Sequence, residues 1–126
     1  MVEFHVDRGS GLPAYLQLNQ QVREAMRLGW LQPGDRLPTV RDVVATSGVN
    51  ANTVLKAYRE LELAGLVEAR QGSGTFVKGT LGTAAPEDLG PLRDELAAWV
   101  AEARSAGLED EDVYALLREV LSGGTG

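Results

Sequence analysis

The sequence predicts a mainly α-helical fold with a small β-hairpin, in which an N-terminal winged helix-turn-helix is followed by a short two-helix C-terminal tail. Three short segments with helical apolar spacing come first, and a glycine-containing turn joins the second to the third. Two β-favouring runs separated by a Gly-rich tetrapeptide predict the hairpin. A Gly- and Pro-rich stretch then leads to two further apolar helical faces, which predict the tail.

The first two predicted helices have clear boundary residues. Helix one is expected over residues 14–28, directly after Pro13, because proline suits the start of a helix. Gly29 is its expected stop. Helix two is expected to start at Thr39, whose hydroxyl can accept a hydrogen bond from a free backbone N–H, and to end before Gly48.

The third helix and the hairpin complete the predicted winged helix-turn-helix. Asn50 is expected to cap the third helix, and only residues 47–49 separate it from helix two, a joint typical of a helix-turn-helix. Residues 66–70 and 75–78 are expected to form the two strands, which must pack on the helices because an isolated hairpin is only marginally stable. The apolar stripe of the third helix consists of Val54, Ala57, Tyr58 and Leu61.

We assign residues 1–78 to a DNA-binding winged helix-turn-helix domain, residues 79–91 to a linker and residues 92–122 to the tail. Two helices this short cannot bury their apolar faces fully against each other, so the tail needs another surface. That surface is either the front domain or a second copy of the chain. The residues expected at a dimer interface are Leu92, Leu96, Trp99, Val100, Val113, Leu116, Leu117 and Val120.

The charge of the chain is unevenly distributed. Its net charge of −6 divides into +1 for residues 1–79, with nine Lys/Arg against eight Asp/Glu, and −7 for residues 80–126, with three against ten. The front half can therefore still present a basic face to a nucleic acid. The acidic run 109–112 is interpreted as a favourable helix start rather than a metal site, because it lacks the spacing of a calcium loop.

Composition argues against several classes of protein. The chain has no cysteine and a single histidine, His5, so no thiolate or zinc site and no catalytic Ser/His/Asp set is expected. We expect no enzymatic activity, metal or cofactor. No apolar run reaches the roughly 18 residues of a membrane span and no signal-peptide pattern is present, so a cytoplasmic protein without membrane contact is expected.

Three regions offer candidate DNA contacts, and each also has a plainer interpretation. The third helix presents Asn52, Lys56 and Arg59 away from its apolar stripe, a set suited to bases and phosphates; the alternative is an ordinary solvated face. Arg41 could face the DNA or instead form a surface ion pair. The run 70–74 could approach a phosphate wall closely or be a plain flexible turn.

Three ordered motifs between residues 10 and 78 resemble the GntR family of bacterial regulators. Residues 31–42 (LQPGDRLPTVRD) look like the family's L-x-P-G-x-x-L-P-S-x-R segment, and residues 48–54 (GVNANTV) like its turn and recognition helix. Residues 61–77 are similar to its L-x-x-x-G and G-x-G-T-F-V wing. The candidate DNA-binding residues are then Thr39, Arg41, Asn50, Ala51, Asn52, Thr53, Lys56, Arg70, Gln71, Gly72, Ser73 and Gly74.

The short tail is similar to the YtrA-type subfamily. That resemblance implies regulation of an ABC-transporter operon and a tail that holds a homodimer together. Because two reading heads would be related by a two-fold axis, a double-stranded operator with an inverted repeat is expected. The regulator is expected to be a repressor, with an activator as the alternative. The tail is too short for the larger effector domains of other members, so a small-molecule effector would need a small pocket beside it. A protein-interaction adaptor without specific DNA binding is the alternative function.

Overall fold

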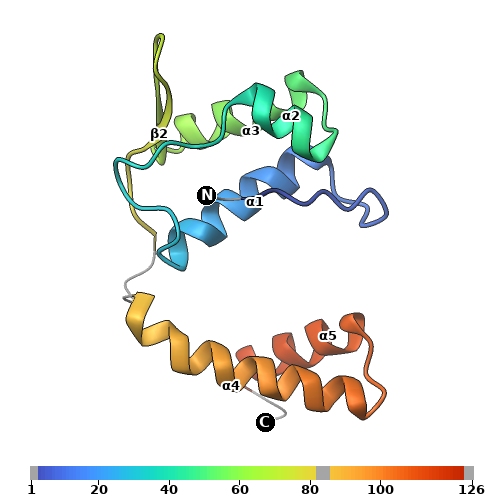
Figure 1. Ribbon diagram of the computed structural model, residues 1–126. Coiled ribbons are helices and arrows are strands. Elements are labelled where there is room, and N and C mark those ends of the chain that lie inside the picture. Colours follow the sequence, from blue (N-terminus) through green and yellow to red (C-terminus); the bar gives the residue numbers. More distant parts are fainter. Residues whose placement is uncertain (1–2, 82–85, 124–126) are drawn as a thin grey trace. The chain divides into compact units, whose positions relative to one another are not determined.

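The computed structural model describes residues 3–81 and 86–123, and the chain divides into two compact units, Met1–Pro86 and Glu87–Gly126. Figure 1 shows three helices and a hairpin in the first unit and a pair of helices in the second. This agrees with the predicted fold class.

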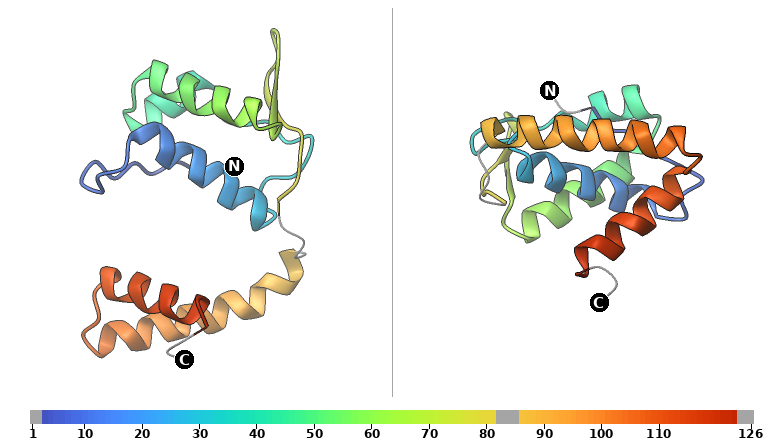
Figure 2. Two further views of the ribbon diagram at one scale, coloured as in Figure 1. Left: turned by 180° about the vertical axis from the view of Figure 1, so that it is seen from behind. Right: turned by 90° about the horizontal axis from the view of Figure 1, so that it is seen from below.

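In the first unit, helix α1 (Ala14–Arg27) packs on α3 (Ala51–Leu63), and α2 (Val40–Ser47) also packs on α3. Figures 1 and 2 show α3 between the other two helices and the hairpin. The predicted boundary residues operate as expected: Pro13 precedes α1, Thr39 caps α2 and Asn50 caps α3. Local sequence signals are therefore sufficient to place these three helices.

One hydrophobic core holds the first unit together. All three helices contribute their apolar stripes to it, so every helix buries one face and exposes the other. The buried core residues are Phe4, Leu18, Val22, Ala25, Met26, Leu31, Leu37, Val43, Val49, Val54, Ala57, Tyr58, Leu61, Leu66, Val67 and Val77.

The hairpin consists of β1 (Val67–Arg70) and β2 (Gly74–Val77), paired antiparallel with Val67 opposite Val77 and Arg70 opposite Gly74. It is not isolated, because Val67 and Val77 are buried in the core. The loop before α2 also pairs with it: the Leu37 N–H donates to the Thr75 carbonyl at 2.8 Å. These contacts provide the support that a two-stranded hairpin requires.

An N-terminal arm packs along α1 and contributes to the core. Phe4 is only 5% exposed. The side chain of Gln21 accepts a hydrogen bond from the His5 N–H at 3.0 Å and donates one to the His5 carbonyl. Gln17 does the same with Asp7, at 2.8 and 2.9 Å. The side chains of Gln17 and Gln21 thus bind the backbone N–H and C=O groups of the arm, as the backbone of a neighbouring strand would.

The second unit contains α4 (Pro86–Ser105) and α5 (Asp110–Leu121). The predicted linker 79–91 is wrong in its last part, because residues 86–91 belong to α4. Proline is favourable at the first helical position, which Pro86 occupies, and Pro91 removes only one hydrogen bond from a helix of 20 residues. Residues 79–81 lie outside helices and strands, and residues 82–85 of the predicted linker lie outside the described residues.

The acidic run 109–112 starts α5, as the sequence indicated. Glu109 is the N-cap, and Asp110, Glu111 and Asp112 occupy the first turn. The Asp112 carboxylate accepts a hydrogen bond from the Glu109 N–H at 2.9 Å. Negative charge at this position is favourable because the free N–H groups of a helix start carry partial positive charge.

The arm generates the first testable prediction. Phe4→Ala should lower the free energy of unfolding by about 3–5 kcal/mol, because it leaves a ring-sized cavity in the core. Thermal unfolding followed by circular dichroism measures the effect. His5→Ala is the matched control, since His5 is exposed and binds Gln21 only through its backbone. Equal stability of the two variants would show that the arm is not part of the core.

Candidate nucleic-acid interface

The first turn of α3 is the centre of the candidate interface. The Asn50 side chain accepts a hydrogen bond from the Asn52 N–H at 2.7 Å, so it caps the helix. Asn50, Ala51, Asn52 and Lys56 are exposed, and Thr53 is half-buried. The predicted base-reading residues therefore lie together on the solvent side of α3, while the stripe that begins at Val54 faces the core.

The turn between α2 and α3 is held in one conformation. Gly48 has φ +73°, a left-handed value that favours glycine, and its N–H donates to the Val44 carbonyl. The Ser47 hydroxyl donates to the Val43 carbonyl at 2.6 Å and accepts from the Val49 N–H at 3.2 Å. With Val49 buried as well, the angle between the two helices is fixed.

A buried tyrosine connects α3 to the start of α2. The Tyr58 hydroxyl donates to the Pro38 carbonyl at 2.6 Å. Burial raises the pKa of Tyr58, and the charge of Asp42 raises it further. The hydroxyl therefore remains protonated and able to donate throughout the neutral range. Pro38 directly precedes Thr39, whose hydroxyl accepts from the Asp42 N–H at 3.1 Å and caps α2.

Arg41 lies in the first turn of α2, and its side chain is exposed. The alternative reading, an ion pair with Asp42 or Asp35, is not formed within the described parts of the chain. Asp35 instead accepts a hydrogen bond from the Gln32 N–H at 2.9 Å. The Arg41 guanidinium is thus available to an external anion.

The wing presents a cation beside a tip with little side-chain bulk. Gln71, Gly72 and Ser73 are exposed at the tip. The Arg70 guanidinium lies 4.4 Å from the centre of the Phe76 ring, and its Nε donates to Glu68 at 3.0 Å. Arg70 is therefore oriented by two neighbours, and Glu68 offsets part of its charge.

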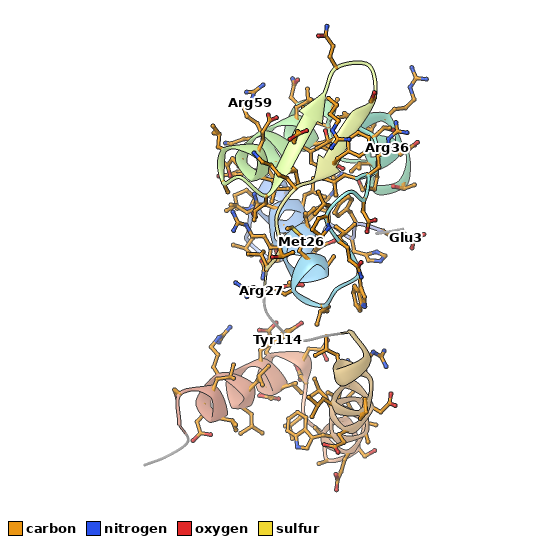
Figure 3. All side chains as sticks on the ribbon, turned by 90° about the vertical axis from the view of Figure 1, so that its left-hand side faces the viewer. Glu3, Met26, Arg27, Arg36, Arg59 and Tyr114 are labelled. Atoms are coloured by element: carbon orange, nitrogen blue, oxygen red, sulfur yellow. The ribbon has the colours of Figure 1, made fainter. Side chains whose placement is uncertain are left out.

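Lys56 and Arg59, two other cations of the region, each lie against neighbouring residues that the sequence did not indicate. The Lys56 ammonium lies 3.9 Å from the centre of the Tyr15 ring, so it connects α3 to α1 while remaining exposed. Arg59 lines a shallow pocket between α3 and the wing, together with Val40, Ala69 and Thr75. Figure 3 shows Arg59 beside the hairpin.

Arg36 was not among the predicted DNA contacts, although it is exposed and contacts the wing. Its main chain forms a β-bridge with Phe76. A single bridge leaves no periodic pattern in the sequence, so the sequence alone does not predict this pairing. The exposed Arg36 before the buried Leu37 is the one local sign of an extended segment.

The residues predicted for a dimer interface lie on the two helices of the second unit, and most are exposed. Ala103 is the only buried residue among those described in this unit. An apolar groove between α4 and α5 is lined by Leu96, Trp99, Val113 and Leu117 among others. Val100 and Val113 are half-buried, and the exposed fractions of Leu92, Leu96, Trp99, Leu116, Leu117 and Val120 range from 36% to 62%.

The described residues contain no group of three or more His, Cys, Asp or Glu side chains that could hold a metal ion. No helix within residues 3–81 and 86–123 is long and apolar enough to cross a membrane.

A capped reading helix, a fixed turn before it and an arginine-bearing wing define a winged helix-turn-helix DNA-binding protein. The profile described as "Bacterial regulatory proteins, gntR family" matches residues 14–77. The chain belongs to the GntR family of transcription regulators, which bind DNA and are not enzymes.

Relatives of similar length support this assignment over about nine-tenths of the chain. It is 42% identical over 119 residues to the HTH-type transcriptional regulator Rv1152 of Mycobacterium tuberculosis, covering 91% of each. It is 34% identical over 116 residues to the HTH-type transcriptional repressor YtrA of Bacillus subtilis, covering 91% of this chain and 89% of YtrA. The predicted resemblance to the YtrA type is thereby confirmed.

A solved structure matches the first unit. The DNA-binding domain of AraR, in complex with operator ORX1, has a TM-score of 0.56 and 28% identity. The match covers 61% of this chain and 99% of the AraR chain. The winged helix-turn-helix fold is therefore one that is found on operator DNA.

The hydrogen bond between Tyr58 and Pro38 generates the second prediction. Tyr58→Phe should lower the free energy of unfolding by about 1–3 kcal/mol, because the buried Pro38 carbonyl loses its donor. Urea unfolding should show a lower midpoint with an unchanged m-value. Tyr15→Phe is the control, since no hydrogen bond of the Tyr15 hydroxyl is found among the described residues. A midpoint shift no larger than that of the control would contradict the prediction.

Proposed function

We propose that the chain is a sequence-specific repressor that binds an inverted-repeat operator as a homodimer. The observation that carries the proposal is the start of α3, where the exposed Asn50, Ala51 and Asn52 surround a capped helix end and Lys56 follows one turn later. Arg41 is exposed in the first turn of α2. Asparagine can bond adenine in the major groove, while arginine and lysine bind guanine or phosphate. The operator complex of the AraR domain supports the same use of this fold.

The tail supports the dimeric part of the proposal. Six of the residues predicted for the interface are apolar side chains that are more than one-third exposed, a surface unusual for a protein that acts alone. A second copy offers an identical apolar surface, and a two-fold contact buries both at once. Two reading helices related by a two-fold axis then require half-sites about 34 Å apart, or a multiple of that distance.

The regulatory role is inferred from the relatives. YtrA is named a repressor, and this chain matches it across both units. The YtrA-type resemblance also suggests that an ABC-transporter operon is the target and that the protein acts in the cytoplasm. If an effector exists, the groove between α4 and α5 is the place for it, because an Arg104–Asp110 ion pair at 3.0 Å adds polar atoms to an apolar lining.

The adaptor alternative has less support. A protein-binding surface is usually depleted of charge at its centre and rich in aromatic side chains. At the exposed start of α3, Asn50, Asn52 and Lys56 are polar, and Leu55 is the large apolar side chain exposed beside them. The two functions predict different DNA binding by variants of Arg41 and Arg70: loss of binding for a DNA-binding regulator, and no effect for an adaptor.

DNA binding generates the third prediction. If each subunit binds three to five phosphates, the slope of log affinity against log salt should be about −5 to −9, at roughly −0.9 per phosphate. The double variant Arg41→Ala/Arg70→Ala should lose retention of the DNA upstream of the chain's own gene in a mobility-shift assay. Arg27→Ala, at the last turn of α1, is the control. A salt-insensitive complex, or full retention by the double variant, would contradict the proposed function and favour the adaptor.

The dimer generates the fourth prediction. Leu96→Asp or Trp99→Asp should give monomers that keep a folded first unit but bind the operator weakly, because a carboxylate in an apolar contact is costly. Sedimentation velocity measures the oligomeric state. Ala98→Asp places the same charge on α4 at an exposed position outside the groove and should leave the dimer intact. If the Leu96 and Trp99 variants sediment as dimers, the tail is not the dimer contact.

A further inference from the structure

The segment that carries Arg36 is fixed to the wing by its backbone. The Gly34 N–H donates to the Val77 carbonyl at 2.9 Å, and the Val77 N–H donates to the Asp35 carbonyl at 2.7 Å. The Leu37 N–H donates to the Thr75 carbonyl at 2.8 Å. Arg36 itself lies opposite Phe76 in an antiparallel bridge. The segment therefore pairs with the free edge of β2 through a β-bridge and three flanking hydrogen bonds.

The pairing determines which face of the wing carries the Arg36 side chain. Residues directly opposite each other in an antiparallel pair point to the same face, and so do residues two positions apart along a strand. Arg36 therefore shares a face with Phe76, and with Glu68, which is the partner of Phe76 in β1. The other face carries Val67 and Val77, which are buried. Arg36 lies on the outer face, next to solvent.

Gly74 brings the Arg36 guanidinium close to the wing tip. A Cβ atom at Gly74 would lie 2.8 Å from Arg36 Nε and 3.4 Å from its Cζ and Nη2. The guanidinium thus lies across the position where any other residue would have a side chain. Gly74 also has φ +123°, which L side chains rarely adopt. Figure 3 shows Arg36 beside the hairpin and Arg27 at the remote end of the unit.

The charges around Arg36 show what it adds to the wing. Glu68, the acidic residue on the same face, is 3.0 Å from Arg70 and offsets that arginine. Asp35 accepts a hydrogen bond from the Gln32 N–H and forms no ion pair within the described residues. Arg36 itself has no ion-pair partner among these residues. The wing face would be nearly neutral without Arg36, and with it the face carries a net positive charge.

We propose that Arg36 is a phosphate contact of the wing, in addition to Arg70, and that Gly74 is glycine partly to let the guanidinium reach the tip. This inference rests on the proposed DNA-binding function. A phosphate contact contributes affinity without sequence preference, because every duplex presents the same backbone. Its loss should therefore weaken binding to operator and unrelated duplexes alike and reduce the salt dependence.

Arg36→Gln and Arg36→Lys in the full chain separate charge from packing. Glutamine removes the charge but keeps a polar chain over Gly74, whereas lysine keeps the charge. Fluorescence anisotropy with a labelled duplex from upstream of the chain's own gene, and with an unrelated duplex, gives affinities at several salt concentrations. Arg27→Gln is the control, and Arg41→Ala reports on the operator contact. Circular dichroism checks that each variant is folded.

Arg36→Gln should weaken binding to both duplexes by about tenfold, since exposed charge contacts are individually weak and a dimer has two of them. The salt slope should become less negative by about 1.8, or roughly 0.9 per subunit. Arg36→Lys should stay within about threefold of the parent with its slope unchanged, and Arg27→Gln should match the parent.

Two results would overturn the Arg36 proposal while leaving the proposed function intact. In the first, Arg36→Gln binds as the parent does. In the second, both Arg36 variants weaken binding with an unchanged slope, which would show that Arg36 only packs against the wing. If the parent binds neither duplex, the proposed function fails and the Arg36 contact fails with it.

Discussion

The burial of one face of α3 is the constraint on which the rest of the first unit depends. Val54, Ala57 and Leu61 are fully buried against α1 and the hairpin, and full burial of a large aliphatic side chain contributes about 1.5–3 kcal/mol. Because the helix is held by this stripe, its opposite side must face solvent. The exposed asparagines at its start are therefore a consequence of core packing.

The turn and the tyrosine make that orientation specific. Burial of the stripe alone would permit small rotations of α2 relative to α3. The left-handed Gly48, the Ser47 hydrogen bonds and the Tyr58–Pro38 bond each remove part of this freedom. Arg41 and Asn52 come from different helices, and their separation is set by these short contacts rather than by either helix alone.

Much of the fold was predictable because its signals are local. Pro13, Thr39 and Asn50 mark helix starts, and the 3.6-residue apolar period identified the stripes that the core buries. The start of α4 was not predicted, because Gly90 and Pro91 are ordinarily helix-breaking residues. The role of the arm was also missed, because the burial of Phe4 depends on residues distant in the sequence.

The candidate interface was predictable in a similar way. The exposure of Asn50, Asn52 and Arg41 followed from their positions on helices whose apolar faces were evident. The contacts of Lys56 with Tyr15, and of Arg36 with Gly74, join separate elements, and nothing in the local pattern indicates them. The turn alone is enough to explain a glycine at position 74. Only the folded structure shows that this glycine also leaves space for the Arg36 guanidinium.

The arm also determines where this protein can be divided. The family profile begins at residue 14, so a fragment designed on that boundary would start with α1. Such a fragment would lack the Phe4 ring, and the side-chain amides of Gln17 and Gln21 would lose the arm's backbone groups. The smallest autonomous reading head therefore begins no later than Phe4, ten residues before the start of the family profile.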